Sequence, residues 1–93
     1  MYARVVRFAD VDPEQIEGRL EERVEAGPPE GAPVTGIQMM HDPEQRTAVV
    51  VQLFDTADDM RAGEAVFAAM DPSETPGTRA SVDRCEIKAD MSV

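Results

Sequence analysis

The sequence predicts one α+β domain over residues 1–93, with its strands and helices in the order βαββαβ. Two valine-rich runs predict central strands, because β-branched residues favour extended backbone. Two other stretches begin with capping residues and then repeat apolar residues at helical spacing. A length of 93 residues suits one hydrophobic core and therefore one domain.

The first half of the chain is expected to form a strand over residues 2–9 and a helix from Pro13 to about Ala26. Asp12 can accept hydrogen bonds from the first turn of this helix, and proline suits its first position. Gly27 is a typical residue at a helix C-terminus. Every fourth residue of the helix is apolar, which gives one narrow stripe: Ile16, Leu20 and Val24.

The second half is expected to hold a hairpin, a helix and a final strand. The hairpin strands cover residues 34–41 and 46–54, and D-P-E-Q between them is typical of a turn. Thr56 begins T-A-D-D, which resembles a capping box, so the second helix should start there. A loop over residues 71–77 separates this helix from a last strand over residues 79–91. The apolar stripe of the second helix consists of Met60, Gly63, Phe67 and Met70.

This order of elements predicts a ferredoxin-like arrangement with a four-stranded antiparallel sheet. The first and third strands would lie at its centre and the second and fourth at its edges, and both helices would cover one face. Because Gly63 has no side chain, it would let the second helix approach the sheet closely.

The central strands carry apolar residues on both sides, so a monomer would leave one face of the sheet in water. Such a face would exceed the few hundred Å² that monomers usually expose. We therefore expect a homodimer in which two sheets pack face to face, as a dimeric α+β barrel. The second face is expected to carry some of the following residues, or the set of opposite parity: Ala3, Val5, Ala48, Val50 and Phe54.

Acidic residues outnumber basic ones, with 19 Asp and Glu against 9 Lys and Arg, and the net charge is −10. Nucleic acids and anionic membrane surfaces attract basic proteins, so neither is an expected partner. No apolar run approaches the roughly 20 residues that span a bilayer, and the N-terminus lacks the apolar segment of a signal peptide. Because Cys85 is the single cysteine, we expect a cytoplasmic protein in a reducing compartment.

Three segments carry a resemblance to a known family: V-V-R-F, G-I-Q-M-M-H-D-P and V-V-V-Q-L-F-D-T-A-D-D-M. From Tyr2 to about Lys88 the chain resembles the antibiotic-biosynthesis monooxygenase-like (ABM-like) proteins of the dimeric α+β barrel superfamily. The resemblance implies two ferredoxin-like subunits packed sheet to sheet, each with a pocket between its sheet and its helices. Some members are cofactor-free oxygenases of polycyclic aromatic compounds. Haem-degrading members use an Asn and a Trp, which this chain lacks, so no cofactor is expected.

His41, the only histidine, is a candidate catalytic residue at the end of the second strand. Imidazole titrates near neutral pH, so His41 could act as a general base at the mouth of a pocket. With Asp42 and Glu44 it could also form a metal site, although metal ligands usually lie on rigid elements. The alternative is a surface histidine beside a turn, and no metal is expected.

Basic residues within the predicted strands are a second group of candidates: Arg4, Arg7, Arg84 and Lys88. The first and fourth strands are expected neighbours, so Arg4 or Arg7 could approach Arg84. Such a cluster would attract an anionic or enolate-like ligand. The alternative is ordinary pairing with acids across the strands. The acids available for that pairing are Asp83, Glu86 and Asp90.

Gln52 places an amide within an apolar central strand, where a buried polar group needs hydrogen-bond partners. It could orient a substrate carbonyl, or it could form a hydrogen bond across a dimer. The methionines could line an adaptable apolar pocket or simply fill the core. The candidate ligand-binding residues are Gln38, Gln52, Met60, Phe67 and Arg84.

Together these features predict a small-molecule-binding protein, which could be a cofactor-free monooxygenase or isomerase acting on an aromatic or enolisable substrate. In this hypothesis Gln52, Arg4 and His41 orient and polarise the substrate. The competing hypothesis is a non-catalytic homodimeric assembly or regulatory module whose pocket is closed.

Overall fold

The computed structural model describes residues 1–27, 30–69 and 77–92, without the side chain of Leu20. Met70 and most of the loop expected at residues 71–77 therefore lie outside the described residues. The elements are β1 (Tyr2–Ala9), α1 (Pro13–Ala26), β2 (Gly36–Asp42), β3 (Thr47–Phe54), α2 (Ala57–Ala68) and β4 (Thr78–Glu86).

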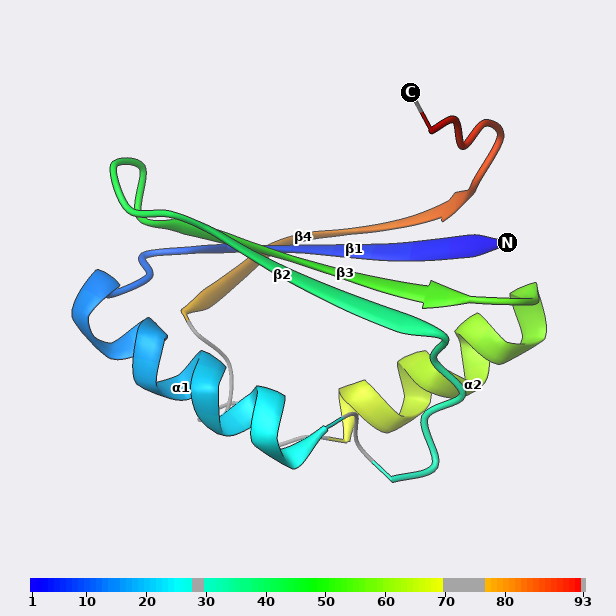
Figure 1. Ribbon diagram of the computed structural model, residues 1–93, viewed down its shortest axis with the longest axis horizontal. Coiled ribbons are helices and arrows are strands. Elements are labelled where there is room, and N and C mark those ends of the chain that lie inside the picture. Colours follow the sequence, from blue (N-terminus) through cyan, green and yellow to red (C-terminus); the bar gives the residue numbers. More distant parts are fainter. Residues whose placement is uncertain (28–29, 70–76, 93) are drawn as a thin grey trace.

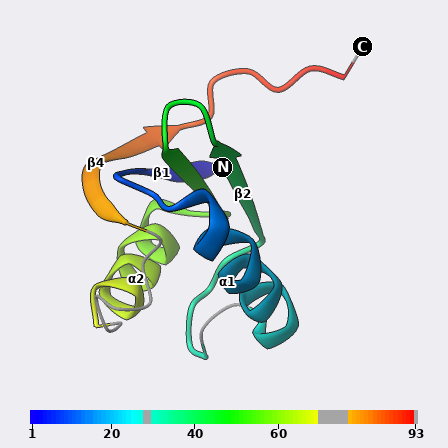
Figure 2. The same cartoon turned by 90° about the vertical axis from the view of Figure 1, so that its left-hand side faces the viewer.

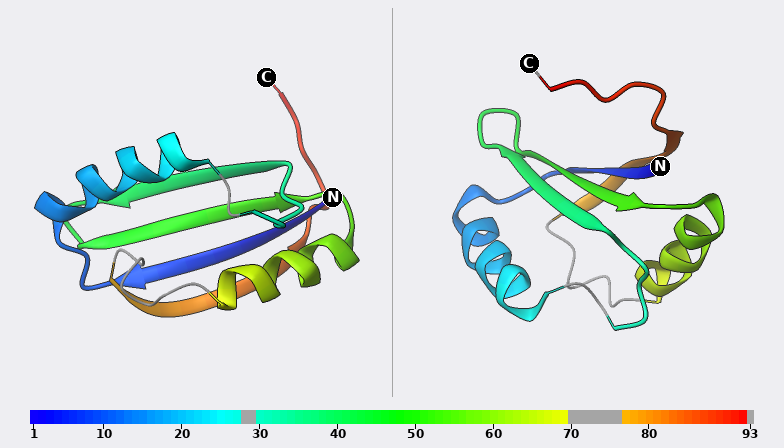
Figure 3. Two further views of the ribbon diagram at one scale, coloured as in Figure 1. Left: turned by 90° about the horizontal axis from the view of Figure 1, so that it is seen from below. Right: turned by 45° about the vertical axis from the view of Figure 1, so that its right-hand side comes forward.

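The four strands form one antiparallel sheet in the order β2-β3-β1-β4, so β1 and β3 are central, as predicted. Figure 1 shows α1 and α2 on one face of this sheet, and Figure 2 shows the same two layers from the side. Seen from below, α1 lies toward β2 and α2 toward β4 (Figure 3). The α+β class and the four-stranded sheet are confirmed, and the arrangement is compatible with a ferredoxin-like fold.

The predicted capping residues and turn are also confirmed. The Asp12 carboxylate accepts a hydrogen bond from the Glu14 N–H at 2.9 Å at the start of α1. The Thr56 hydroxyl oxygen accepts one from the Asp59 N–H at 3.0 Å at the start of α2. In the hairpin turn, the Asp42 carboxylate accepts from the Glu44 N–H at 3.1 Å. Each of these side chains satisfies backbone donors that the local geometry leaves free.

Three strands are shorter than predicted: β2 and β3 start two residues and one residue later, and β4 ends where its partner strand begins. β4 ends at Glu86 rather than at residue 91, since Glu86 pairs with Tyr2, the first residue of β1. One further backbone hydrogen bond follows, from Ile87 N–H to the Met1 carbonyl at 2.9 Å. β2 starts at Gly36, two residues after the predicted start, opposite Leu53 of β3.

The core lies between the sheet and the helices. One group of buried apolar residues joins β1 and β3 to the first turn of α1: Val6, Phe8, Val11, Ile16 and Ala48. At the other helix, the fully buried ring of Phe54 lies directly against Gly63, where an added Cβ atom would overlap it. The close approach predicted for Gly63 is therefore confirmed.

The expected second sheet face is confirmed for Ala3 and Val5 but not for Ala48, Val50 and Phe54, because the predicted set combined residues from both faces. Opposed residues lie on the same side of a sheet, and Val6 pairs with Val50 while Val5 pairs with Val51. Val6 and Val50 belong to the core side, so Ala48 and Phe54 face the helices with them. The opposite side of the central strands, which we call the open face, carries Ala3, Val5, Val49, Val51 and Leu53.

Helix α1 covers less of the sheet than its apolar stripe predicts. Ile16 is buried, but Val24 is 76% exposed. Figure 1 shows the reason, since α1 runs away from the sheet toward its C-terminal end. Among the described residues, no helix is long and apolar enough to cross a bilayer.

Candidate functional site

Three polar residues form a row across the helix-covered face of the sheet. Arg4 of β1 is the register partner of Gln52 on β3 and of Arg84 on β4. Arg4 and Gln52 occupy inward positions that alternate with outward ones along their strands, and both are buried. The alternation of each strand and the register together therefore bring these three candidates into one place.

Arg4 is a buried cation, with only 3% of its surface exposed. Its Nη1 donates a hydrogen bond to Gln52 Oε1 at 2.9 Å. Its Nε lies 3.7 Å from Glu64 Oε1, and this buried atom has no hydrogen-bond partner among the described residues. The guanidinium carbon lies 5.8 Å from the centre of the Phe67 ring, within reach of a cation–π interaction. Gln52, Glu64 and Phe67 therefore hold Arg4 in place, but its Nε still lacks a hydrogen-bond partner among the described residues.

Glu64 reaches the row from α2 and forms an ion pair with Arg84. Arg84 Nε donates to Glu64 Oε2 at 2.9 Å, and Arg84 Nη2 donates to Glu64 Oε1. Both carboxylate oxygens are used, which is the bidentate geometry that arginine favours. This pair is more open to solvent than Arg4, since the Arg84 and Glu64 side chains are 51% and 24% exposed.

The proton affinities of these groups reflect their surroundings. Burial lowers the pKa of Arg4, and the charge of Glu64 partly opposes that effect. The hydrogen bonds from Arg84 lower the pKa of Glu64, and the charges of Arg4 and Arg79 lower it further. The same contact raises the pKa of Arg84. Glu64 is thus held as a carboxylate by the arginines around it.

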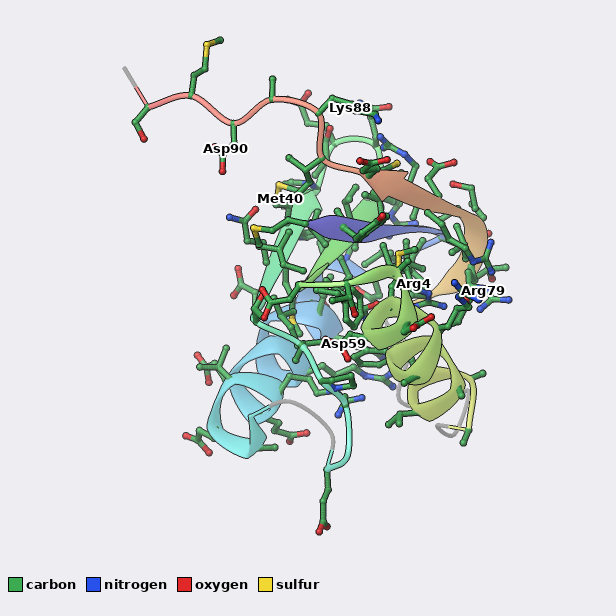
Figure 4. The ribbon with its side chains drawn as sticks, turned by 90° about the vertical axis from the view of Figure 1, so that its right-hand side faces the viewer. Arg4, Met40, Asp59, Arg79, Lys88 and Asp90 are labelled. Atoms are coloured by element: carbon green, nitrogen blue, oxygen red, sulfur yellow. The ribbon has the colours of Figure 1, made fainter. Side chains whose placement is uncertain are left out.

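Among the described residues, positive charge exceeds negative charge at this site. Arg79 of β4 adds a third cation that acts on both Arg4 and Glu64, and Figure 4 shows Arg79 beside Arg4 near α2. We call Arg4, Arg79 and Arg84 the arginine cluster. It lies within a chain whose net charge is −10, so it is a local reversal of the overall charge. Such a cluster can stabilise a carboxylate, phenolate or enolate oxygen.

His41 does not join the arginine cluster. It lies on the helix-covered face but pairs with Ala48. Ala48 is four residues from Gln52 along β3, which corresponds to about 13 Å at about 3.3 Å per residue. Its Nε2 is buried and has no hydrogen-bond partner among the described residues. The neighbouring Asp42 uses its carboxylate to hold the hairpin turn. In the described part of the chain, no group of three or more His, Cys, Asp and Glu could hold a metal ion.

The other candidates are divided between the two faces. Met60 is buried, and Phe67 lies over Arg4, so both α2 candidates are on the site's side. Gln38 pairs with Val51 and is exposed on the open face, away from Gln52. Arg7 is likewise exposed on that face.

The pairing of strand cations with acids across the strands is not found among the described residues. Lys88 forms an ion pair with Glu86 at 3.0 Å, on the C-terminal side of β4. Figure 4 places Lys88 and Asp90 well away from Arg4 and Arg79. Arg84, in contrast, pairs with an acid of the helix rather than with one of its own strand.

Glu64 and Arg79 were not among the residues singled out from the sequence. Glu64 follows Met60 by four residues and precedes Phe67 by three, so it lies on the inward stripe of α2. A carboxylate on an apolar stripe is the signal that could have identified it. The β-bulge between Arg7 and Phe8, which brings Arg79 opposite Phe8, has no such signal in the sequence.

The segments that carry the family resemblance all contribute to the sheet. V-V-R-F lies in β1, G-I-Q-M-M-H-D in β2, and V-V-V-Q-L-F in β3, where it includes Gln52. Comparison of the chain with protein-family models, curated proteins and solved structures found no match.

Proposed function

We propose that this protein binds a small anionic ligand, aromatic or enolisable, at the arginine cluster. The observation that carries the proposal is the direct opposition of Arg4 and Arg84 across β1 and β4 with one carboxylate of the described residues between them. Like charges directly opposite each other destabilise a sheet, so this pair favours the binding of an anion. An anion would offset the remaining positive charge.

The chemistry that this cluster supports is stabilisation of negative charge on oxygen. Arg4 and Arg84 would stabilise the enolate or phenolate oxygen of a bound ligand, so the neutral ligand becomes easier to deprotonate. Formation of such an anion is the shared first step of isomerisation and of cofactor-free oxygenation. The proposal therefore includes a cofactor-free monooxygenase or isomerase of the ABM-like type, and Gln52 acts in it by positioning Arg4.

A titration of the ¹⁵N-labelled chain with sodium benzoate, followed by NMR, tests the binding proposal. We expect benzoate to shift the Nε–H signals of Arg4 and Arg84, and neutral benzamide of similar shape to leave them unchanged. Arg84→Gln should weaken benzoate binding about ten-fold or more, because a charge-assisted hydrogen bond contributes about 1.5–3 kcal/mol. Arg61→Gln, which removes an exposed arginine of α2, is the matched control and should bind as the wild type does.

If benzoate shifts no arginine signal in the wild-type chain, the binding proposal is refuted. If Arg61→Gln weakens binding as much as Arg84→Gln does, the benzoate responds to net charge and not to this site. Either result would favour the non-catalytic alternative.

The alternative function, a homodimeric assembly module, is favoured by the open face. Half-buried apolar side chains cover its centre, and Met40 at its edge is 49% exposed. At roughly 25 cal/mol per Å², covering several hundred Å² per subunit is worth on the order of 10 kcal/mol before association costs. The open face of a second copy could bury this surface, and the two subunits would then form a dimeric α+β barrel. The lone Cys85 supports placing this dimer in a reducing cytoplasm.

Light scattering at micromolar concentration tests the dimer. Val51→Lys places a charge at the centre of the open face and should produce a monomer. Val24→Lys changes an exposed valine of α1 and should leave the dimer intact. A wild-type chain that is monomeric under these conditions would refute the dimer without affecting the binding proposal.

A further inference from the structure

We propose that the ligand is an aryl carboxylate that displaces Glu64 from Arg84. In the unliganded protein, the Glu64 carboxylate lies where the carboxylate of this ligand would bind. This inference rests on the proposed function, because it names the class of anion and the residue that competes with it. Glu64 then acts as a specificity-determining residue, since only a ligand that replaces its carboxylate can enter.

The first support is the way Glu64 is held. Both of its oxygens accept hydrogen bonds from Arg84, yet both side chains of the pair are partly exposed to solvent. Ion pairs of this exposure are weak, because water competes for both partners. Glu64 is therefore a counter-ion that a ligand can replace without unfolding the sheet.

The second support is the unsatisfied donor of Arg4. Its Nε is buried and lies 3.7 Å from Glu64 Oε1, too far for a hydrogen bond, and the described part of the chain offers it no other partner. Glu64 is fixed to α2 and its two oxygens are engaged by Arg84, so it leaves this donor unused. A free carboxylate is not tethered and could place one oxygen on Arg84 and the other on Arg4. Buried donors without a partner are rare in native proteins, and this one points to a group that is supplied from outside.

The third support concerns the rest of the ligand. Phe67 lies three residues after Glu64 on α2, with its ring over the Arg4 guanidinium. A ring attached to the incoming carboxylate would therefore meet an aromatic side chain. An aliphatic carboxylate would lack that contact, so the geometry favours an aryl carboxylate.

The test compares benzoate binding by the wild-type chain, Glu64→Gln and Asp58→Asn. Asp58→Asn removes one negative charge from the exposed side of the same helix, so it controls for the change in net charge. If Glu64 competes with the ligand, its removal raises the fraction of open sites, and benzoate should bind about ten-fold more tightly to Glu64→Gln. Asp58→Asn should bind as the wild type does.

The outcomes distinguish this inference from the proposed function. Tighter binding by Glu64→Gln alone supports the inference. Equal or weaker binding by Glu64→Gln overturns it, while wild-type binding at the arginine cluster leaves the proposed function standing. No binding by the wild-type chain and by Glu64→Gln overturns both.

A measurement on the wild-type chain covers the case in which Glu64→Gln does not fold. The Glu64 side-chain carboxyl carbon can be followed by ¹³C NMR at neutral pH, where benzoate stays ionised, with and without saturating benzoate. Loss of the hydrogen bonds from Arg84 should move this signal toward that of an exposed glutamate carboxylate. A Glu64 signal that stays unchanged at saturation would overturn the inference.

Discussion

Arg4 and Arg84 are register partners on neighbouring strands, and both guanidinium groups meet the same carboxylate, that of Glu64 on α2. Two cations in this relation repel each other unless an anion lies between them. Glu64 therefore contributes to the stability of the β1–β4 pair and to the packing of α2 against it. Predictions about stability follow from this arrangement and from the contacts around it.

The stabilisation that Glu64 provides should disappear in acid. Arg84 holds the pKa of Glu64 below its ordinary value of 4.5, so the unfolded chain binds this proton more readily than the folded one. The contribution is fully present above the unfolded pKa and is lost as the pH falls through the lower, folded pKa. The free energy of unfolding of the wild type should therefore exceed that of Glu64→Gln near neutral pH, with the difference shrinking below about pH 4.5.

Urea unfolding of both chains at a series of pH values measures that difference. The remaining carboxylates titrate in both chains, so their contribution cancels in the comparison. A difference that stays constant into the acid range would show that the Glu64–Arg84 contact does not stabilise the fold.

Gln52→Leu should destabilise the protein much more than Gln38→Leu. Gln52 accepts the hydrogen bond from the buried Arg4 Nη1, and a leucine would leave that donor without its partner. The expected loss is about 1–3 kcal/mol in the free energy of unfolding. Gln38 is exposed on the open face, so its replacement should change stability by less than about 0.5 kcal/mol. Equal effects in urea unfolding would contradict the importance of the Arg4–Gln52 bond.

Two glycines in helices should respond in opposite directions to alanine. Gly63→Ala should cost about 1–3 kcal/mol, because the new methyl group overlaps the buried Phe54 ring. Gly18→Ala meets no atom within 4 Å and should gain about 0.5–1 kcal/mol, because alanine is the better helix former. Thermal unfolding followed by circular dichroism measures both changes. A stabilising Gly63→Ala would mean that α2 lies farther from the sheet.

His41→Leu should leave the stability unchanged or raise it by up to about 1 kcal/mol. The buried Nε2 of His41 has no hydrogen-bond partner among the described residues, so leucine removes a polar group that is costly to bury. Benzoate binding should also be unchanged, because His41 lies about 13 Å along β3 from the row that includes Gln52. Weaker benzoate binding by a folded His41→Leu chain would restore His41 to the candidate site.

Several features of the fold could be predicted because they depend on neighbours in the sequence. Asp12 and Thr56 cap the helices that they were expected to cap, and both central strands were located from their valine-rich runs. Such features are local, since a cap or a turn is decided within a few residues. The C-terminal end of β4 was less predictable, because it is set by where β1 begins.

The candidate site was predictable only as a set of separate residues. Arg4, Gln52 and Arg84 were each noticeable as polar groups in strands, but the sequence does not say which of them share a face. A shift of one residue in register would move one member of the row to the open face. His41 and Gln38 were expected to belong to the same site, but His41 lies far along the sheet and Gln38 lies on the opposite face.

By itself, the sequence determined the order of elements, the caps and the valine-rich strands, because each depends on local chemistry. The missing side chain of Gly63 allowed a close approach, but the Phe54 ring that fills this space is a tertiary contact. Only the tertiary structure decided that Arg4 would meet Arg84 and that Glu64 would meet both. These residues are separated by many positions along the chain, so they come together only through the register of the sheet and the packing of α2. The same register decides which apolar residues lie on the open face, and hence which surface the proposed dimer would use.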